Sequence, residues 1–507
     1  MPNVKEGSVI EYKYVIKSPY FHEVNDWYFQ YAIPANNVSF EMAVPIYFDY
    51  NRYLAGYVHV DQTAPSKRWG VASNFEEVFT VYSAKNIKAL KQEAYVGNVR
   101  NYLSILKHEL AAVKMKNQEP KYYSTDWEAV SKKIYTHDDF GKQLGYKDYF
   151  AKDLDPLLKG ATTNEQKMQV VYNFVKERMN WNENSRLFCD KGVKKAYEAR
   201  VGNSSEINIM LTAMLRHAGL NANPVLVSTR SNGVALYPTI AAYNYVIAAL
   251  KTDSGFMLLD ATSKNALPNV LPVRTLNWVG RLIQQDGSTV EIDLMPKTSS
   301  KEVMNISVAM DKDGKISGKT RDQYFDYNAH NFRENYAGTS KESYIEKLEK
   351  YYKGIEISEY TVHNEKDLSK PVMEEYSFTH NNVSDVIGDK IYFSPMLFTV
   401  TASNPFKDDT REYPIEFVFP QQDRYMVNIT IPEGYKVESL PKPVTLMMEE
   451  GIGSFKYNIV SKDNQVQLSV IYDINYATVS KDYYDTLKDF FQKMIEKQNE
   501  KIILKKA

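Results

Sequence analysis

The sequence is poor in cysteine, proline and glycine, and it has no excess charge of either sign. One cysteine in 507 residues excludes an internal disulfide framework and any metal site built from several thiolates. The 20 prolines and 22 glycines show no periodic spacing, which excludes collagen-like and low-complexity chains. Lys and Arg number 62 against 63 Asp and Glu, a formal charge of −1, which argues against nucleic acid or an anionic membrane as the main partner.

Long apolar runs are also missing. The longest run, residues 239–250, is interrupted by Asn244 and falls short of the ~20 residues that cross a bilayer, so we expect no transmembrane segment. The N-terminus lacks the apolar stretch of a signal peptide. Because residues 8–17 already alternate like a strand, we expect the chain to be cut from a longer precursor.

What is present is the composition of a globular protein. Hydrophobic residues make up 43% and charged residues 25%, and the length predicts about three domains at ~150 residues each. Residues 1–120 alternate with a period of two at 8–17, 27–30, 40–44 and 79–81, which predicts an antiparallel β-sandwich.

The pattern changes near residue 121. Residues 164–181 carry apolar side chains at helical spacing. A second helix is predicted by a stripe that we expect Gly219 to end, namely Ile207, Met210, Leu211, Met214, Leu215 and Ala218. Short apolar strands follow at 224–227, 243–250 and 256–259. Two helices and then antiparallel strands indicate a compact α+β domain over residues 121–285.

From residue 286 to 507 we expect a second mainly antiparallel β-domain. Its predicted strands are residues 303–309, 397–402, 413–419, 425–431 and 466–472. Thr339 and Glu342 form a capping-box pattern that predicts a helix start, and residues 481–497 predict a terminal amphipathic helix. Residues 311–314 share four positions with a calcium loop but are interpreted as a hairpin turn.

The most informative motif opens the second helix. Asn203 is a natural N-cap, and Glu206 three residues later completes a capping box. Ser204 then occupies the first helical position, at the positive end of the helix dipole. A nucleophile at this place would have its anionic form stabilised.

These residues resemble a known family. The run from Gly202 to Glu206 and the amphipathic helix after it resemble the Gly-x-Cys-x-Asp motif of transglutaminase-like domains, and residues 227–233, 243–247 and 258–262 resemble the strands that follow there. With residues 27–30 and 431–435, the whole chain resembles bacterial proteins that carry a DUF3857 β-domain, a transglutaminase-like centre and a DUF3858-type β-domain. The resemblance implies a central papain- and transglutaminase-like α+β domain between two mainly antiparallel β-sandwiches.

Transglutaminase-like enzymes use a Cys-His-Asp triad. The resemblance places Ser204 at the cysteine position, Tyr245 at the histidine position with Asn244 beside it, and Asp260 at the aspartate position. A serine hydroxyl is a far weaker acid than a thiol, and tyrosine, with an ordinary pKa of about 10, is a poor base at pH 7. We therefore expect a degenerate triad.

Four further residues are candidate functional residues. Cys189 lies 15 residues before Ser204 with no helix start beside it, so a small buried residue is the favoured interpretation. Asn203, Arg230 and Asn244 are candidates for binding a ligand, although Arg230 precedes a turn and could equally serve that turn. The histidines show no metal-ligand spacing, and we expect neither a metal nor a cofactor.

Two functions remain open at this point. The favoured one is a non-catalytic protein that binds a peptide, a cell-surface polymer or a protein partner through the old cleft, which needs only shape and hydrogen-bonding groups. The alternative is an active amide hydrolase, a protease or peptidase, that uses Ser204 with a base from elsewhere in the chain. The resemblance also implies a periplasmic or otherwise extracytoplasmic location.

Overall fold

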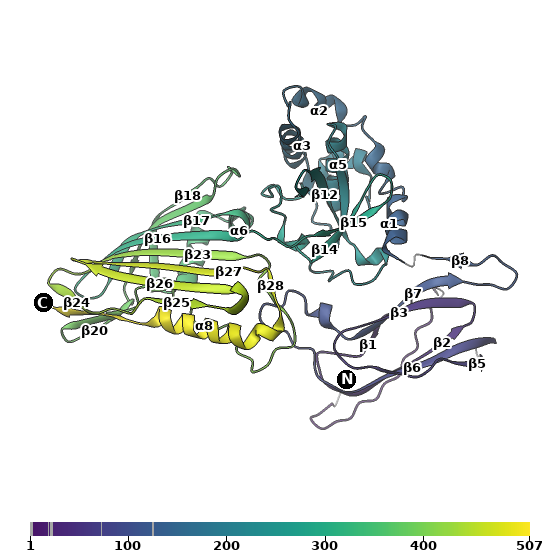
Figure 1. The fold of residues 1–507 in the computed structure, drawn as a ribbon, viewed down its shortest axis with the longest axis horizontal. Coiled ribbons are helices and arrows are strands. Elements are labelled where there is room, and N and C mark those ends of the chain that lie inside the picture. Colours follow the sequence, from purple (N-terminus) through teal and green to yellow (C-terminus); the bar gives the residue numbers. More distant parts are fainter. Residues whose placement is uncertain (1–3, 19, 21–23, 72–73, 124–125) are drawn as a thin grey trace. The chain divides into compact units, whose positions relative to one another are not determined.

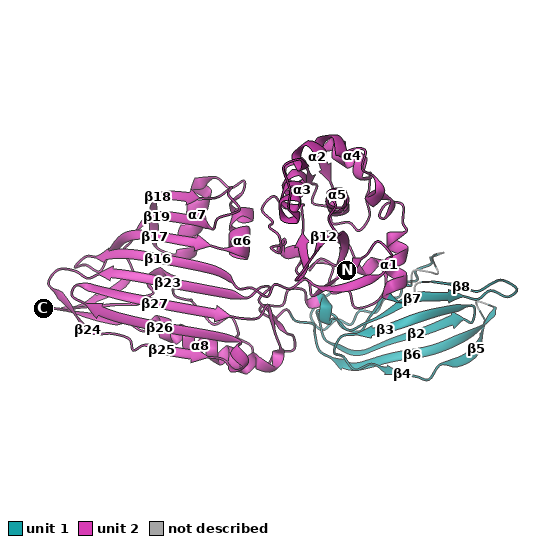
Figure 2. Ribbon diagram, turned by 45° about the horizontal axis from the view of Figure 1, so that its top comes forward, with its two compact units in different colours: residues 1–91, 100–126 teal, residues 92–99, 127–507 magenta. Residues whose placement is uncertain are grey.

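The computed structural model describes residues 4–18, 20, 24–71, 74–123 and 126–507 (Figure 1). The chain separates into two compact units (Figure 2). One unit comprises residues 1–91 and 100–126, and the other comprises residues 92–99 and 127–507. No helix in the described part of the chain is long and apolar enough to cross a membrane.

The first unit is built from two four-stranded sheets. One contains β2 (Ala35–Pro45), β6 (Phe75–Ile87), β4 (Asp61–Gln62) and β5 (Ser66–Gly70), and the other contains β1 (Trp27–Tyr28), β7 (Ile105–Val113), β3 (Phe48–Ala55) and β8 (Lys121–Tyr122). Their small core is formed by Phe29, Tyr82, Ala84, Ile87 and Leu106. Both sheets pair antiparallel, as the period-two patterns predict.

The prediction of a strand at residues 8–17 is wrong. The structure has no strand there, and alternate side chains such as Tyr12, Tyr14 and Ile16 are about 70% exposed on this segment. Alternation predicts a strand only where one face is buried against a partner, and this segment buries neither face.

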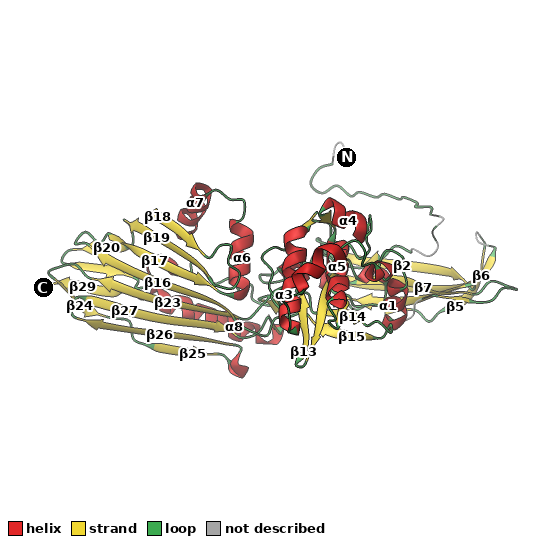
Figure 3. Cartoon of the chain, turned by 90° about the horizontal axis from the view of Figure 1, so that it is seen from above, coloured by secondary structure: helices red, strands yellow, loops and turns green. Residues whose placement is uncertain are grey.

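The α+β part of the second unit begins with five helices. These are α1 (Trp127–Tyr135), α2 (Ala151–Leu158), α3 (Asn164–Arg178), α4 (Val193–Ala199) and α5 (Ser204–His217). A five-stranded antiparallel sheet follows in the order β13 (Gly255–Leu259), β12 (Tyr245–Thr252), β11 (Ala222–Val227), β14 (Val279–Ile283) and β15 (Thr289–Asp293). Helix α5 packs on β11 and β12 of the sheet and also contacts α3 and α4 (Figure 3). The predicted pair of helices and the antiparallel strands are confirmed.

The rest of the second unit centres on an eight-stranded sheet. Its order is β18 (Ile355–His363), β19 (Val372–His380), β17 (Ile316–Tyr324), β16 (Ser300–Met310), β23 (Gln421–Thr430), β27 (Gln465–Ile474), β26 (Gly453–Lys462) and β25 (Val444–Met447). All its pairs are antiparallel except β16 with β23. The hairpin turn predicted at residues 311–314 joins β16 to β17.

One face of the large sheet is covered. The amphipathic helix α8 (Tyr484–Asn499) buries Leu487, Phe491 and Met494 in the same core as the sheet. Helices α6 (Asp326–Tyr336) and α7 (Lys341–Tyr352) pack near the β17–β18 side of the large sheet. A small sheet adds to the same core and consists of β20 (Ser384–Ile387), β21 (Lys390–Phe393), β29 (Ile502–Lys506) and β24 (Tyr435–Ser439). A separate two-stranded antiparallel pair is formed by β22 (Ile415–Glu416) and β28 (Thr478–Val479).

Three local predictions in this region are corrected. Residues 397–402 form a short 3₁₀ turn at Leu397–Thr399, and only Ile415–Glu416 of residues 413–419 is a strand. Both segments bury apolar side chains in the core while most of their residues lie outside any strand ladder, and hydrophobicity alone cannot distinguish this from a strand. Helix α7 is capped by Ser340, whose Oγ accepts a bond from Ser343 N at 3.2 Å, so it starts one residue later than the Thr339 pattern indicates.

Taken together, the elements from α1 to β15 form an α+β core, and β-rich regions precede and follow it along the chain. The three-domain division at residues 120 and 285 stays a prediction, as does the assignment of the N-terminal region to DUF3857.

Candidate functional site

The start of α5 has the capping box that its sequence predicts. Asn203 Oδ1 accepts a bond from Glu206 N at 2.9 Å, and Glu206 Oε2 accepts one from Asn203 N at 2.9 Å. Glu206 Oε1 also accepts a bond from Lys191 N at 2.7 Å, and Asn203 Nδ2 donates to Phe188 O at 3.1 Å. Both side chains therefore fix the start of α5 against residues 184–191.

Ser204 is held by the same segment. Its Oγ accepts a bond from Arg186 N at 2.9 Å and donates one to Arg186 O at 3.0 Å. Its backbone N donates to Asn184 O at 3.1 Å, and the side chain is fully buried. Within the described residues the Ser204 hydroxyl bonds to main-chain atoms of Arg186, so its proton points at a carbonyl and not at a side-chain base.

Tyr245 and Asp260 lie together. Tyr245 Oη donates to Asp260 Oδ2 at 3.0 Å and is 2.8 Å from Thr262 Oγ1, while Arg274 Nε donates to Tyr245 Oη at 3.3 Å. Asp260 Oδ1 accepts bonds from Asn208 Nδ2 at 2.9 Å and from the N and Oγ1 of Thr262 at 2.9 and 2.8 Å. Each carboxylate oxygen therefore has a donor, as a fully buried carboxylate requires.

The protonation of Tyr245 follows from this environment. Burial raises the pKa of the phenol far above its usual value, and the Asp260 carboxylate beside it raises it further. A phenol acts as a base only after losing its proton. Tyr245 is therefore a neutral hydrogen-bond donor to Asp260.

Residues that the sequence did not single out complete the site. Asn208, one turn after Ser204 on α5, also donates to Val246 O at 2.8 Å and accepts from Ala261 N at 2.9 Å, so it ties α5 to β12 and to the Asp260 loop. Its signal in the sequence is a polar residue inside an otherwise apolar stripe. Tyr172 of α3 donates to Asp260 O at 3.0 Å.

Arg274 and Trp181 form the outer layer over Tyr245. The Arg274 guanidinium carbon is 4.0 Å from the Trp181 ring centroid and 5.8 Å from that of Tyr245, and Arg274 Nη2 donates to Thr262 Oγ1 at 2.6 Å. Trp181 and Arg274 are partly exposed, whereas the three triad positions beneath are fully buried. No local sequence motif marks either residue, because they come from a two-residue strand, Asn180–Trp181, and a short 3₁₀ helix, Val273–Thr275.

The other sequence candidates make internal contacts. Arg230 Nη2 pairs with Glu416 Oε2 at 2.8 Å and Nη1 donates to Leu276 O at 3.1 Å. Asn244 exchanges two 2.9 Å bonds with Thr229, one to its hydroxyl and one from its backbone N. Ligand binding by Asn203, Arg230 and Asn244 stays a prediction.

Cys189 has the properties of a structural residue. It is buried, and burial together with the Glu206 charge raises the pKa of its thiol well above the ordinary range. Reactive cysteines show the opposite shift, because the thiolate is the nucleophile.

A histidine lies beside the loop that follows Asp260. His330 of α6 is buried, with Nε2 3.4 Å from Ser263 Oγ, and Ser263 Oγ donates to Glu334 Oε1 at 2.8 Å. Burial lowers the pKa of His330, although the Glu334 carboxylate opposes that shift. Among the residues that the structure describes, no group of three His, Cys, Asp or Glu side chains is arranged to hold a metal ion.

Comparison with known proteins agrees with this architecture. The family model of the transglutaminase-like superfamily matches residues 152–261, and that of the domain of unknown function DUF3858 matches residues 389–504. No curated protein matches the chain.

Two crystal structures are similar. One is a "putative protease" from Parabacteroides distasonis, 13% identical, with a TM-score of 0.52 over 95% of this chain and 74% of that one. The other is a "putative cysteine protease" from Cytophaga hutchinsonii, 11% identical, with a TM-score of 0.19 over 47% of this chain and 74% of that one. At these identities the first similarity concerns the fold alone. Residues 152–261 are thus similar to the transglutaminase-like superfamily, and residues 389–504 are similar to the DUF3858 domain.

Proposed function

We propose that this transglutaminase-like protein is non-catalytic, with a degenerate triad, and that it acts by binding a peptide, a cell-surface polymer or a protein partner. The observation that carries the proposal is the pairing of the Ser204 hydroxyl with both main-chain groups of Arg186. A nucleophilic serine instead needs its proton directed at a base.

The chemistry at the other two positions supports the same proposal. A neutral Tyr245 that donates to Asp260 cannot take a proton from a serine hydroxyl. Loss of a general base typically removes a factor of ~10² to 10⁴ from the rate. Hydrolysis, suggested by the name of the first similar protein, would need a different base at Ser204, and the described contacts of His330 are with Ser263 and Glu334.

The outer layer supports partner binding at the old cleft. Trp181 and Arg274 stack at 4.0 Å and are partly exposed above the buried triad positions. Trp and Arg are the side chains most enriched at the energetic centres of protein interfaces. An apolar ring with a cation beside it favours a partner with an aromatic or acidic side chain. As the family resemblance implies, the proposal also places this encounter outside the cytoplasm.

Catalysis is tested with two assays on the full chain and on Ser204→Ala. Hydrolysis of fluorescein-labelled casein and transfer of dansylcadaverine to casein should both stay at the background rate, equal in the two proteins. Turnover that depends on Ser204 would overturn the non-catalytic proposal.

Binding is tested with a selection of displayed 12-residue peptides. Peptides enriched by the wild-type chain should lose at least tenfold in affinity for Trp181→Ala and keep their affinity for Trp69→Ala, a change at a tryptophan that is 64% exposed in the first unit. Enrichment that is insensitive to Trp181→Ala would contradict binding at the old cleft.

A further inference from the structure

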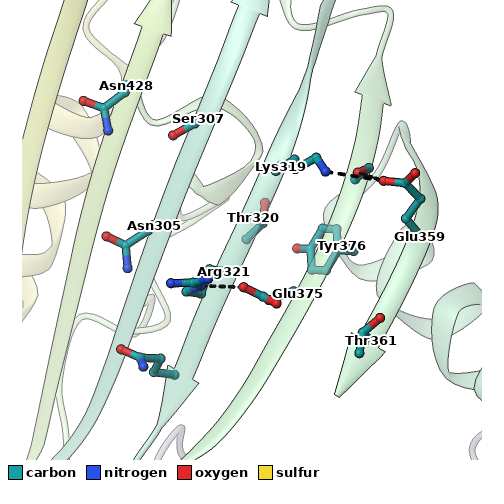
Figure 4. A pocket seen from close by; sticks show the side chains of 12 residues that line it. Asn305, Ser307, Lys319, Thr320, Arg321, Glu359, Thr361, Glu375, Tyr376 and Asn428 are labelled. Carbon is teal, nitrogen blue, oxygen red and sulfur yellow. Dashed lines mark hydrogen bonds and ion pairs between the residues drawn. The ribbon is translucent and has the colours of Figure 1, made fainter. Parts of the chain in front are cut away.

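The uncovered face of the eight-stranded sheet carries a polar groove of about 680 Å³ (Figure 4). Its lining residues come from the five neighbouring strands β18, β19, β17, β16 and β23. This volume is in the range of small-molecule and oligosaccharide sites, about 300–1,000 Å³. The groove belongs to neither the triad positions nor the layer above them.

The strand register arranges these side chains in two rows across the sheet. One row passes from Asn305 through Arg321 and Glu375 to Thr361. The next passes from Asn428 through Ser307 and Lys319 to Ser377. At ~4.8 Å between strands, each row across four strands is about 14 Å long, enough for a few units of a linear polymer.

The groove offers hydrogen-bonding groups that the fold does not use. In the described structure no hydrogen bond involves the side-chain amides of Asn305, Gln323 or Asn428, or the hydroxyls of Ser307 and Thr361. Beside them, Arg321 Nε pairs with Glu375 Oε1 at 2.5 Å, and Lys319 Nζ lies 3.5 Å from Glu359 Oε2. Amides that both donate and accept are the groups that match vicinal hydroxyls.

The composition of the groove also excludes other ligands. Its two cations, Lys319 and Arg321, are balanced by two carboxylates, Glu359 and Glu375. A strongly anionic or cationic polymer would therefore gain no net electrostatic attraction from the groove. It has no apolar floor for hydrophobic side chains, since Tyr376 is 2% exposed. The main-chain groups of β16, β17, β19 and β23 are paired on both sides, so the strand addition by which many sheets bind peptides is open only at the outer edge of β18.

We infer that this groove binds a neutral oligosaccharide, held by Asn305, Asn428 and the Arg321–Glu375 pair. Such a ligand presents many hydroxyls that donate and accept, carries no charge, and needs no main-chain pairing. The inference does not depend on the proposed function of the transglutaminase-like domain, because it concerns a separate surface.

The test is calorimetric titration of the full chain with hexasaccharides of β-1,4-glucose, β-1,4-N-acetylglucosamine, β-1,4-mannose and α-1,4-glucose, each to 5 mM. Hexagalacturonate and a neutral 12-residue peptide serve as the charged and peptide probes. At least one neutral hexasaccharide should bind. Asn305→Ala/Asn428→Ala should weaken that binding by about 10- to 30-fold, the effect of losing two hydrogen-bonding amides.

The matched control is Asn458→Ala, which removes an exposed amide from β26 of the same sheet outside the groove and should leave affinity unchanged. Hydrogen exchange of β16 and β23 verifies that the double variant keeps the sheet. Binding of none of the neutral hexasaccharides, binding that the double variant leaves intact, or tighter binding of the galacturonate or the peptide would each overturn the inference.

Discussion

Replacing Asp322 with asparagine should remove much of the pH dependence of stability in the large C-terminal sheet. Asp322 is fully buried on β17, directly opposite Glu374 on β19, and Glu302 of β16 lies nearby. Burial, reinforced by the Glu374 charge, raises the pKa of Asp322 from 3.8 to about 7. In the described structure neither Asp322 oxygen reaches good hydrogen-bond geometry.

The sign follows from proton linkage. The folded state holds this proton up to a pH of about 7, whereas the unfolded chain releases it near 3.8. The contribution of protonated Asp322 to the free energy of unfolding is therefore fully present below pH 3.8. It is lost as the pH rises through about 7. At 1.36 kcal/mol per pH unit, this difference corresponds to about 4 kcal/mol, an upper value because Glu302 and Glu374 share the site.

The assay has to report on this sheet. All five tryptophans lie before residue 300, so tryptophan fluorescence reports on other parts of the chain. Hydrogen exchange followed by mass spectrometry on peptides from β17 and β19, corrected for the intrinsic effect of pH, gives the local free energy of opening. Between pH 5 and 9 the wild type should lose up to about 3 kcal/mol, since only the two pH units from 5 to about 7 remain, and Asp322→Asn should lose clearly less.

The control is Asp313→Asn in the exposed turn between β16 and β17, which should follow the wild type. An Asp322→Asn curve parallel to that of the wild type across the whole range would refute the argument that this buried carboxyl is protonated in the fold.

Three further predictions concern the transglutaminase-like domain. Tyr245→Phe removes a donor from the buried Asp260 and should lower the free energy of unfolding by about 1–3 kcal/mol in urea titrations. The control Tyr351→Phe changes a ring that is 78% exposed and should have no effect. Equal stability of the two variants would contradict a structural role for Tyr245. Asn203→Ala removes the N-cap of α5 and should cost about 1–2 kcal/mol, and a loss below a few tenths would contradict that role. The Cys189 thiol, whose pKa burial raises, should react with Ellman's reagent only after unfolding, and rapid reaction in the folded protein would contradict its burial.

The start of α5 was predictable because its signals are local. Asn203 and Glu206 lie within one turn and satisfy each other's backbone groups, so the capping box and the position of Ser204 follow from the spacing alone. The buried stripe of α5 and the turn at residues 311–314 are local in the same sense. Residues 8–17 show the limit of such patterns, because a strand also needs a partner that the sequence does not name.

The environment of the triad positions was not predictable in the same way. Arg186 binds Ser204 from 18 residues away, and Arg274 reaches Tyr245 from 29 residues away. These contacts depend on how loops of the transglutaminase-like domain fold back over the helix start. The polar rows on the large sheet likewise depend on strand order, since β16 pairs with β23 across more than 100 residues of chain.

The measurement that tests the central claim most directly is labelling of the folded chain with a fluorophosphonate, followed by mass spectrometry of the peptide that contains Ser204. Such probes modify serine hydroxyls whose proton is taken by a base. With the hydroxyl bonded to both main-chain groups of Arg186, the wild type should show no more adduct than Ser204→Ala. A covalent adduct on Ser204, absent from the variant, would mean an activated nucleophile and would contradict the non-catalytic account.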